Sequence, residues 1–251
     1  MTDAGDRYDT IGRTYNQTRR EDPRVAAIVH AGLGSATSVV NVGAGSGNYE
    51  PRDRTVVAVE PSRQMIDQRA DDRAPAVRGV AEHLPFTDDR FDAAMAILTV
   101  HHWSDPVRGL RELARVAGRQ VVFYFEPLRT HAFWALDYFP AALDLPTEKD
   151  PPGEALLRAH LDVREIREIP VPHDCVDGFG AAFWARPDAY CDPTVQAGMS
   201  WLAMLPDADR STGASRLRRD IDSGEWHRRY GHLLDHETYD AGYRLAIAGT
   251  P

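Results

Sequence analysis

Five short apolar runs, several of them rich in β-branched residues, constrain the fold of this chain more than any other feature. They cover residues 38–42, 55–60, 76–80, 91–97 and 120–126. Near-continuous apolar strands of this length are typical of a parallel sheet that is covered on both faces. Because parallel strands are joined by right-handed crossovers through helices, the pattern predicts an α/β fold with a doubly wound, mostly parallel sheet.

The segments between these runs carry helical signals. Residues 62–70 have apolar side chains at helical spacing, and residues 105–117 form a clearer amphipathic pattern. We expect Asp105 to cap the second helix, Pro106 to occupy its first turn and Gly118 to close it.

After residue 126 the pattern becomes less regular, with a stretch rich in aromatic residues and prolines. We expect a helix at 153–161, a sixth strand at 163–171, mainly helical structure at 172–240 and a last strand at 243–248. At the other end of the chain, residues 11–30 predict two helices that are split near Pro23.

Charge and cysteine content limit the classes of function. The 251 residues include 29 basic and 38 acidic side chains, for a formal charge of −9. A phosphate backbone requires a concentrated basic surface, so we do not expect a nucleic acid partner. Cys175 and Cys191 are too few for a disulfide scaffold. With no signal peptide and no apolar run long enough to span a bilayer, we expect a cytoplasmic protein that does not contact membranes.

A glycine-rich turn, VGAGSG, follows the first strand and contains Gly43, Ala44, Gly45 and Gly47. Such a turn lets a ligand approach the backbone at the carboxyl ends of the strands. The dinucleotide fingerprint GxGxxG is not met, because Asn48 stands where its third glycine belongs. The shorter pattern GxGxG is met, which favours a nucleoside ligand without a pyrophosphate. A tight turn without any ligand is the alternative.

Acidic residues also follow the next two strands. Glu60 ends the second strand, and Ala81 and Glu82 follow the third. A carboxylate in the first position accepts ribose hydroxyls in nucleotide-binding βαβ units, and a side chain in the second position reaches the adenine edge. Each acid alone is typical of a solvated surface, but together with the glycine loop they predict a nucleoside site.

With these motifs the sequence resembles the class I S-adenosylmethionine-dependent methyltransferases, in their small-molecule, methyltransferase type 11-like group. Within residues 38–127 the resemblance is carried by VVNVGAGSGNYE, VVAVEPSRQMIDQR, GVAEHLPFTDDRFDAAMAILTVHHW and RELARVAGRQVVFYFEP. It implies a Rossmann-like sheet of seven strands with a helical insertion between the last two. It also implies S-adenosyl-L-methionine as the cofactor and methyl transfer as the activity.

The resemblance implies a cofactor site built at the strand ends, with the glycines under the methionine part, Glu60 on the ribose and Met65 on the adenine. The residues implied to bind the cofactor are Tyr15, Asn41, Gly43, Ala44, Gly45, Gly47, Glu60, Pro61, Met65, Ala81, Glu82, Thr99, Val100 and His101. Many members carry an acid where this chain has Asn41. We therefore expect Asn41 to accept a hydrogen bond from the methionine ammonium in place of a charge contact.

Methyl transfer from a sulfonium needs chiefly that acceptor and methyl group are held in line, and a general base helps only when the nucleophile must lose a proton. His101 and His102, just past the fourth strand, are the candidate bases, and Glu126 is a candidate contact to the acceptor. Alternatively, one histidine orients the following loop or packs between sheet and helix. No metal is expected, because His173 and Cys175 lack partners at ligand spacing.

We expect a single methyltransferase domain over residues 1–251. Its parts are a helical lid (1–30), a cofactor-binding half (36–127), a substrate-side cap (128–162 and 172–240) and the last strands (163–171 and 241–248). Tyr15 or Arg19 in the lid is expected to meet the cofactor carboxylate. A solvated amphipathic helix is the alternative for this segment.

All five tryptophans lie at or beyond the end of the fourth strand. With neighbouring phenylalanines and tyrosines they predict either an aromatic-lined cap over an acceptor pocket or the core of a helical insertion. The predicted partner is a small-molecule methyl acceptor, bound by a monomer or homodimer. A methyltransferase acting on RNA or protein, a non-catalytic cofactor-binding module and a nicotinamide-dependent enzyme are the alternatives.

Overall fold

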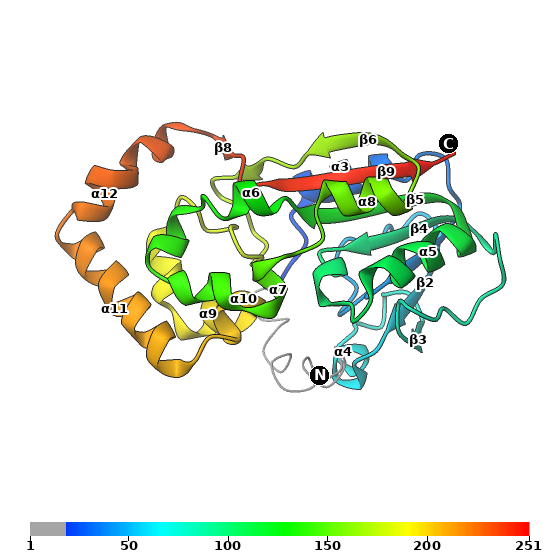
Figure 1. The fold of residues 1–251 in the computed structure, drawn as a ribbon, viewed down its shortest axis with the longest axis horizontal. Helices are drawn as coiled ribbons and strands as arrows, with labels where there is room; N and C mark the ends of the chain where they lie inside the picture. The colour runs from blue at the N-terminus through cyan, green and yellow to red at the C-terminus, as the bar shows by residue number, and fades with distance from the viewer. Residues whose placement is uncertain (1–18, 251) are drawn as a thin grey trace.

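The computed structural model describes residues 19–250. A seven-stranded sheet forms its centre, in the order β3-β2-β1-β4-β5-β9-β6 (Figure 1). The strands are β1 (Ser38–Val42), β2 (Thr55–Glu60), β3 (Ala76–Arg78), β4 (Phe91–Ile97), β5 (Ala117–Phe125), β6 (Val163–Glu168) and β9 (Tyr243–Gly249). The first five pair in parallel, whereas β9 runs antiparallel to both of its neighbours. The α/β fold with a mostly parallel, doubly wound sheet is therefore confirmed.

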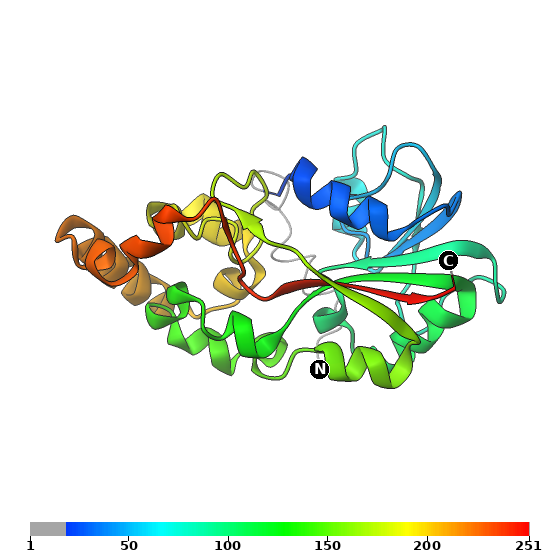
Figure 2. The ribbon, with the colours of Figure 1, turned by 90° about the horizontal axis from the view of Figure 1, so that it is seen from above.

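Helices cover both faces of the sheet (Figure 2). On one face lies α3 (Pro23–Gly32), and on the other lie α5 (Pro106–Val116) and α8 (Glu154–His160), while α4 (Arg63–Asp67) joins β2 to β3. Buried apolar side chains fill the space on each side, so the sheet separates two hydrophobic clusters. Burial on both faces explains why the strands are almost continuously apolar.

Most expected elements are present, and the helix start at Asp105 is confirmed. Its carboxylate accepts a hydrogen bond from Arg108 N at 3.0 Å, and Pro106 begins the helix. The expected closure at Gly118 is wrong. Helix α5 ends at Val116, and Ala117 is already extended because it pairs with Phe91 at the start of β5. The chain passes from helix to strand without a glycine turn.

Two expected strands are shorter than predicted. The third ends at Arg78, and Val80 forms only an isolated bridge with His83. The sixth, expected to reach residue 171, ends at Glu168 because Pro170 cannot donate to the ladder. Beyond it, β7 (Val171–Pro172) pairs with β8 (Thr238–Tyr239) in a separate two-stranded sheet. Of the two helices expected at 11–30, the second is α3, and the first lies outside the described residues.

Helices, most of them short, gather beyond one end of the sheet (Figure 1). Between β5 and α8 these are α6 (Pro127–Thr130), η3 (Trp134–Asp137), η4 (Pro140–Asp144) and α7 (Pro146–Lys149). Between β7 and β8 they are η5 (Pro187–Cys191), α9 (Pro193–Gly198), α10 (Ser200–Ala203), α11 (Asp207–Asp222), α12 (Glu225–Tyr230) and η6 (Gly231–Asp235). We call these helices the cap. Its buried aromatics, including Trp134, Trp184 and Trp226, are continuous with the core on the α3 side of the sheet.

Candidate functional site

The glycine loop after β1 has a backbone that other residues adopt only with strain. Gly43, Gly45 and Gly47 all have positive φ angles, +69° at Gly43. Gly43 N and Ala44 N both donate to Val59 O, at 2.8 and 3.1 Å, which folds the loop over the end of β2. A Cβ on Gly43 would lie 2.1 Å from Thr99 Oγ1, so the loop also lies directly against the residues that follow β4.

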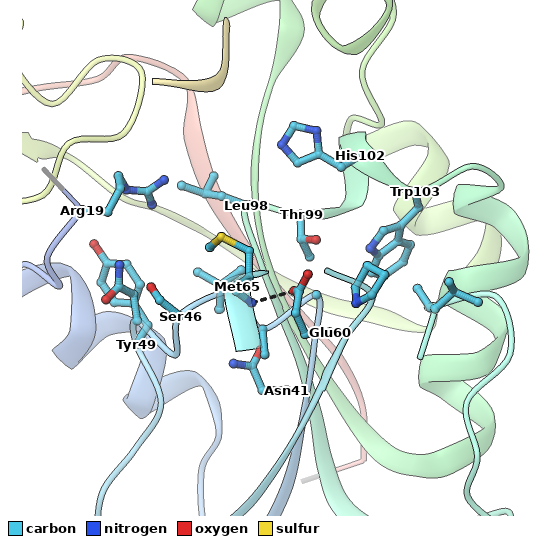
Figure 3. A pocket seen from close by; sticks show the side chains of 18 of the residues that line it. Arg19, Asn41, Ser46, Tyr49, Glu60, Met65, Leu98, Thr99, His102 and Trp103 are labelled. Carbon is cyan, nitrogen blue, oxygen red and sulfur yellow. Dashed lines mark hydrogen bonds between the residues drawn. The ribbon is translucent and has the colours of Figure 1, made fainter. Parts of the chain in front are cut away.

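The Glu60 carboxylate at the end of β2 is fixed by two backbone donors. Gly45 N donates to Oε2 at 2.8 Å (Figure 3). Ser62 N donates to Oε1 at 2.9 Å. Only 5% of Glu60 is exposed, yet it lines a cavity at this edge of the sheet. Since each carboxylate oxygen can accept more than one hydrogen bond, the side chain is oriented by the loop and can still accept from a ligand.

Behind the loop lies a buried polar network. Arg69 forms a salt bridge at 2.7 Å with Glu50, and Asn41 Nδ2 donates to Glu50 Oε1 at 3.0 Å. Asn41 Oδ1 is buried and has no hydrogen-bond partner among the described residues. A buried acceptor without a donor is costly, so this oxygen indicates a missing ligand donor at the cavity that Asn41 lines.

This first cavity comprises about 880 Å³ of space, part of it open to solvent, and lies between the glycine loop, the ends of β2 and β4, and the segment after β3 (Figure 3). Most of the residues expected to bind the cofactor line it, namely Asn41, Gly43, Ala44, Gly45, Glu60, Pro61, Met65, Ala81, Glu82 and Thr99. Of the others, Gly47, Val100 and His101 are not among its described lining residues, and Tyr15 lies outside the described residues.

Glu82 lines this cavity and also organises the loop that follows η2 (Val100–His102). Its Oε1 accepts hydrogen bonds from Ser104 N at 2.7 Å, Ser104 Oγ at 2.8 Å and Asp105 N at 3.0 Å. The carboxylate therefore positions Trp103, whose ring packs on Gly109 and borders the cavity. The sequence did not identify Trp103 as a site residue, since nothing local distinguishes it from the other tryptophans.

A second cavity adjoins the first and comprises about 800 Å³ of space, part of it open to solvent. Its walls come from η2, from the end of β5, and from the cap helices η3, η4, α7 and α10. His101 lines this second cavity only, whereas His102, Leu98 and Arg19 line both cavities. The rings of His101 and His102 lie 3.8 Å apart between centroids. The two candidate bases are thus placed where the cavities meet.

Most of the cap aromatics form its core, and a few face the second cavity. Trp134 packs edge-on against Trp226 at 5.2 Å and donates from Nε1 to Trp184 O at 3.0 Å. Among the aromatics expected over the acceptor pocket, Phe133 and Trp201 line the cavity. The aromatics thus divide between the core of the cap and the lining of a cavity, and that this cavity binds the acceptor stays a prediction.

Glu126 does not occupy the position expected of an acceptor contact. Its Oε2 accepts a hydrogen bond from Glu154 N at 3.0 Å and so caps the first turn of α8. Among the described residues that line the two cavities, Glu126 is absent. A carboxylate at the end of β5 meets the start of α8 because that helix runs back along the sheet. In place of Glu126, the carboxylate that lines the second cavity is Glu148 on α7, which the sequence did not identify.

Arg19 is held between the two cavities by a buried acid. Its Nε donates to Asp177 Oδ1 at 2.8 Å, and Tyr49 Oη donates to Asp177 Oδ2 at 2.7 Å. Asp177 is 0% exposed, and burial of Tyr49 together with the negative charge of Asp177 raises the pKa of Tyr49 well above the usual value. This cluster fixes the segment before α3 next to the glycine loop.

Metal ligation and membrane insertion find no support in the described part of the chain. Among residues 19–250, no group of three or more His, Cys, Asp or Glu side chains is placed to hold a metal ion. Over the same residues, no helix has the length and apolar character needed to cross a membrane.

Known proteins resemble this chain in sequence and fold. A methyltransferase domain family matches residues 40–125. A crystal structure from Anabaena variabilis, described as a methyltransferase from an antibiotic biosynthesis pathway, is 31% identical, has a TM-score of 0.84, and covers 93% of this chain and 100% of its own. The chain therefore belongs to the class I S-adenosylmethionine-dependent methyltransferases, whose cofactor is S-adenosyl-L-methionine.

Curated relatives match mainly the cofactor-binding half. An uncharacterised methyltransferase of Mycobacterium tuberculosis is 36% identical over 88 residues, which cover 33% of this chain and 36% of the relative. A demethylmenaquinone methyltransferase of Thermobifida fusca is 32% identical over 137 residues, which cover 49% of this chain and 58% of the relative. The matches thus span from about a third to about three-fifths of these relatives' length.

Proposed function

We propose that this chain transfers the methyl group of S-adenosylmethionine to a small molecule bound in the second cavity. The observation that carries this proposal is the contact between the two cavities, which share Leu98, His102 and Arg19. A cofactor in the first cavity and an acceptor in the second would meet at these residues. When bound, the cofactor supplies a methyl group already activated on a sulfonium, so holding the acceptor in line is the main task left to the protein.

In the first cavity, each group would bind a different part of the cofactor. Glu60, oriented by Gly45 N and Ser62 N, would accept the ribose hydroxyls. Asn41 Oδ1, which lacks a donor among the described residues, would accept from the methionine ammonium. Arg19, held by Asp177, would face the carboxylate. A nucleoside with an amino acid tail matches this combination of acceptors and one cation.

Proton removal, where the acceptor needs it, is assigned to His102. It lines both cavities, while His101 lines only the second. Histidine as a residue type is half-protonated near pH 6.5 and can take a proton from a hydroxyl or amine at neutral pH. His101, whose ring packs edge-on against Phe125 at 4.8 Å, is assigned a supporting position.

The lining of the second cavity favours a small molecule over a macromolecule. Its walls carry aromatic side chains, among them Phe133, Phe179 and Trp201, together with a few polar groups, as is typical of ligand pockets. The cap at 128–162 and 172–240 is therefore proposed as the acceptor side of a single domain. Cytoplasmic location and a monomeric or dimeric state stay predictions.

Calorimetry with S-adenosylmethionine, S-adenosylhomocysteine and NAD tests the cofactor assignment. We expect both sulfur ligands to bind and NAD not to bind. Glu60→Gln replaces one acceptor oxygen by a donor and should weaken both sulfur ligands by about 10- to 100-fold, the range of a lost charged hydrogen bond. The exposed Glu237→Gln provides the matched control and should change nothing. Tight binding of NAD, or failure of both sulfur ligands to bind, would refute the assignment.

A screen of metabolite pools for a cofactor-dependent gain of one methyl group tests the reaction. His102→Gln should then lower kcat and flatten its pH profile near neutrality, whereas His101→Gln should affect mainly KM. A protein or RNA fraction that gains the label, with no gain in the small-molecule pool, would favour the macromolecular alternative.

A further inference from the structure

Glu148 is the carboxylate among the described residues that line the second cavity. It lies on the short helix α7, in a wall that otherwise presents mainly apolar surface. The apolar side chains suited to contact an aromatic ligand are Leu98, Phe125, Phe133, Leu136, Phe179 and Trp201. A single acid in such a cavity is a specific polar feature, as expected of a group that orients a ligand.

Among the described residues, no cationic side chain forms an ion pair with this carboxylate. Its side-chain hydrogen bond comes from the neighbouring Thr147 Oγ1, at 3.4 Å from Glu148 Oε1. Among residues 19–250, no Arg, Lys or His forms an ion pair with it. The contact from His131 is to the Glu148 backbone oxygen, at 3.0 Å from Nε2.

Burial raises the pKa of Glu148 to about 7, against a smaller lowering by the Thr147 hydroxyl. Tyr243, which also lines the cavity, has a raised pKa, first through burial and then partly through the negative charge of Glu148. The two side chains therefore border the same space. A carboxylate that forms no ion pair in a mainly apolar cavity costs stability, and such groups are enriched at ligand sites.

We propose that Glu148 recognises the methyl acceptor by accepting a hydrogen bond from a hydroxyl or amine group on an otherwise apolar, ring-containing molecule. This rests on the proposed function only in naming the second cavity as the acceptor site. Anionic acceptors are disfavoured, because the Glu148 carboxylate would repel a second negative charge and Arg19, which also lines the cavity, is assigned to the cofactor carboxylate. Glu148 thus selects the acceptor class, while His102 remains the group assigned to the proton.

Four compounds on one ring frame test this assignment: 2-naphthol, 2-(aminomethyl)naphthalene, 2-naphthoate and 2-methylnaphthalene. Their affinities are measured by calorimetry for the full chain, with and without saturating S-adenosylhomocysteine. We expect the hydroxyl and amine compounds to bind best. Glu148→Leu should weaken these two by about 10- to 100-fold, the effect of losing a hydrogen bond to a charged group. Glu148→Leu should leave 2-methylnaphthalene within about twofold, since area burial is little changed.

The variant Glu148→Gln distinguishes recognition of the hydroxyl compound from recognition of the amine compound. It keeps an acceptor oxygen but removes the charge, so the amine compound should lose more affinity than 2-naphthol. Glu237→Gln, in the exposed segment before β8, is the matched control and should bind all compounds as the wild type does. Binding of none of the compounds, preference for 2-naphthoate, or equal loss of all four in Glu148→Leu would overturn the proposal.

The same titrations distinguish this proposal from the proposed function. If S-adenosylhomocysteine fails to bind, the methyltransferase function fails, while the compound series without it still tests Glu148. If S-adenosylhomocysteine binds and the series shows no dependence on Glu148, only the acceptor assignment fails.

Discussion

Asn41 and Glu50 share one hydrogen bond, 3.0 Å long, in which the Asn41 amide donates and the Glu50 carboxylate accepts. Glu50 is 3% exposed and also forms a salt bridge with Arg69. The amide therefore has its nitrogen committed to Glu50 and its oxygen left for the cavity. This gives a physical reason for an amide at position 41, where the resemblance to the family leads one to expect an acid.

Asn41→Asp should destabilise the free protein. The new carboxylate would face Glu50 at hydrogen-bond distance, and two adjacent buried carboxylates disfavour each other's ionised form. We expect a loss of about 1–3 kcal/mol in the free energy of unfolding at pH 8, the cost of leaving a buried group unsatisfied. Urea denaturation measures it.

The control for this prediction is the double variant Asn41→Asp with Glu50→Gln. The amide introduced at position 50 would donate to the carboxylate introduced at position 41, which restores one hydrogen bond with the donor and acceptor exchanged. Because Glu50→Gln also removes the charge that pairs with Arg69, the reference is the Glu50→Gln single variant, in which Asn41→Asp should cost less at pH 8 than it does in the wild type. Wild-type stability in Asn41→Asp alone would contradict the explanation.

Gly43→Ala should impair both stability and cofactor binding. The new Cβ would meet Thr99 Oγ1 at 2.1 Å, in a residue with φ of +69°. Gly224→Ala is matched in backbone, with φ of +78°, but nothing lies within 4 Å of its Cβ. The control should show only the strain of a left-handed alanine, about 1–2 kcal/mol.

Thermal denaturation and S-adenosylhomocysteine titration separate the two effects. Gly224→Ala should keep the wild-type affinity for S-adenosylhomocysteine. Gly43→Ala should lose at least about tenfold in this affinity, because the glycine loop must shift away from Thr99 and its contacts to the ligand are then misplaced. Equal behaviour of the two variants would show that backbone strain alone accounts for the effect.

The sequence predicted the parts of the fold and site that depend on local pattern. Strands β1, β2 and β4 match their expected bounds because their apolar runs are buried on both faces. Asp105 was identified because capping needs only a short side chain before a helical segment. The glycine loop was identified for a similar reason, because a positive φ restricts the choice of residue.

Tertiary contacts explain what the sequence did not predict. Glu126 does lie at the predicted edge of the sheet, yet its carboxylate turns to cap α8, which adjoins it in space and not in local sequence. Glu148 lies in a single helical turn within an irregular segment, so no periodicity indicates that it faces a cavity. The partnership of Arg19 with Asp177 joins residues far apart in the chain, and neither has a local motif.

Asp177→Ala should be among the most destabilising single substitutions in the chain. It removes the buried acid that accepts hydrogen bonds from Arg19 and Tyr49 and that forms an ion pair with the Arg19 side chain, itself only 11% exposed. Breaking a buried pair in this way costs about 3–5 kcal/mol. Tyr49→Phe removes one hydrogen bond to the same acid without changing charge and should cost only about 1 kcal/mol. Urea denaturation of both variants checks this, and similar losses would mean that the charge pair contributes little.

Glu148 should make the stability of the protein depend on pH in a defined window. Its pKa rises from 4.5 to about 7 on folding, so the native state holds a proton that the unfolded chain releases. The resulting stability is fully present below about pH 4.5 and is lost as the pH rises to about 7, by at most about 1.4 kcal/mol per pH unit. Histidines as a class also titrate in this range, and His101, His102 and His131 line the same cavity, so only a difference isolates Glu148.

The contribution of Glu148 is measured as the difference in unfolding free energy between wild type and Glu148→Gln, because the introduced amide does not titrate. Arg19 and Tyr243, which also line the cavity, keep their charge state across this window. We expect the unfolding free energy of the variant, relative to that of the wild type, to increase between pH 4.5 and 7. Below and above this range, the difference between the two should be constant. Because the ionised carboxylate is the form that accepts a charge-assisted hydrogen bond, 2-naphthol should narrow the difference above pH 7. A difference that does not vary with pH would show that folding leaves the pKa of Glu148 unchanged, and hence that the cavity solvates the carboxylate as water does.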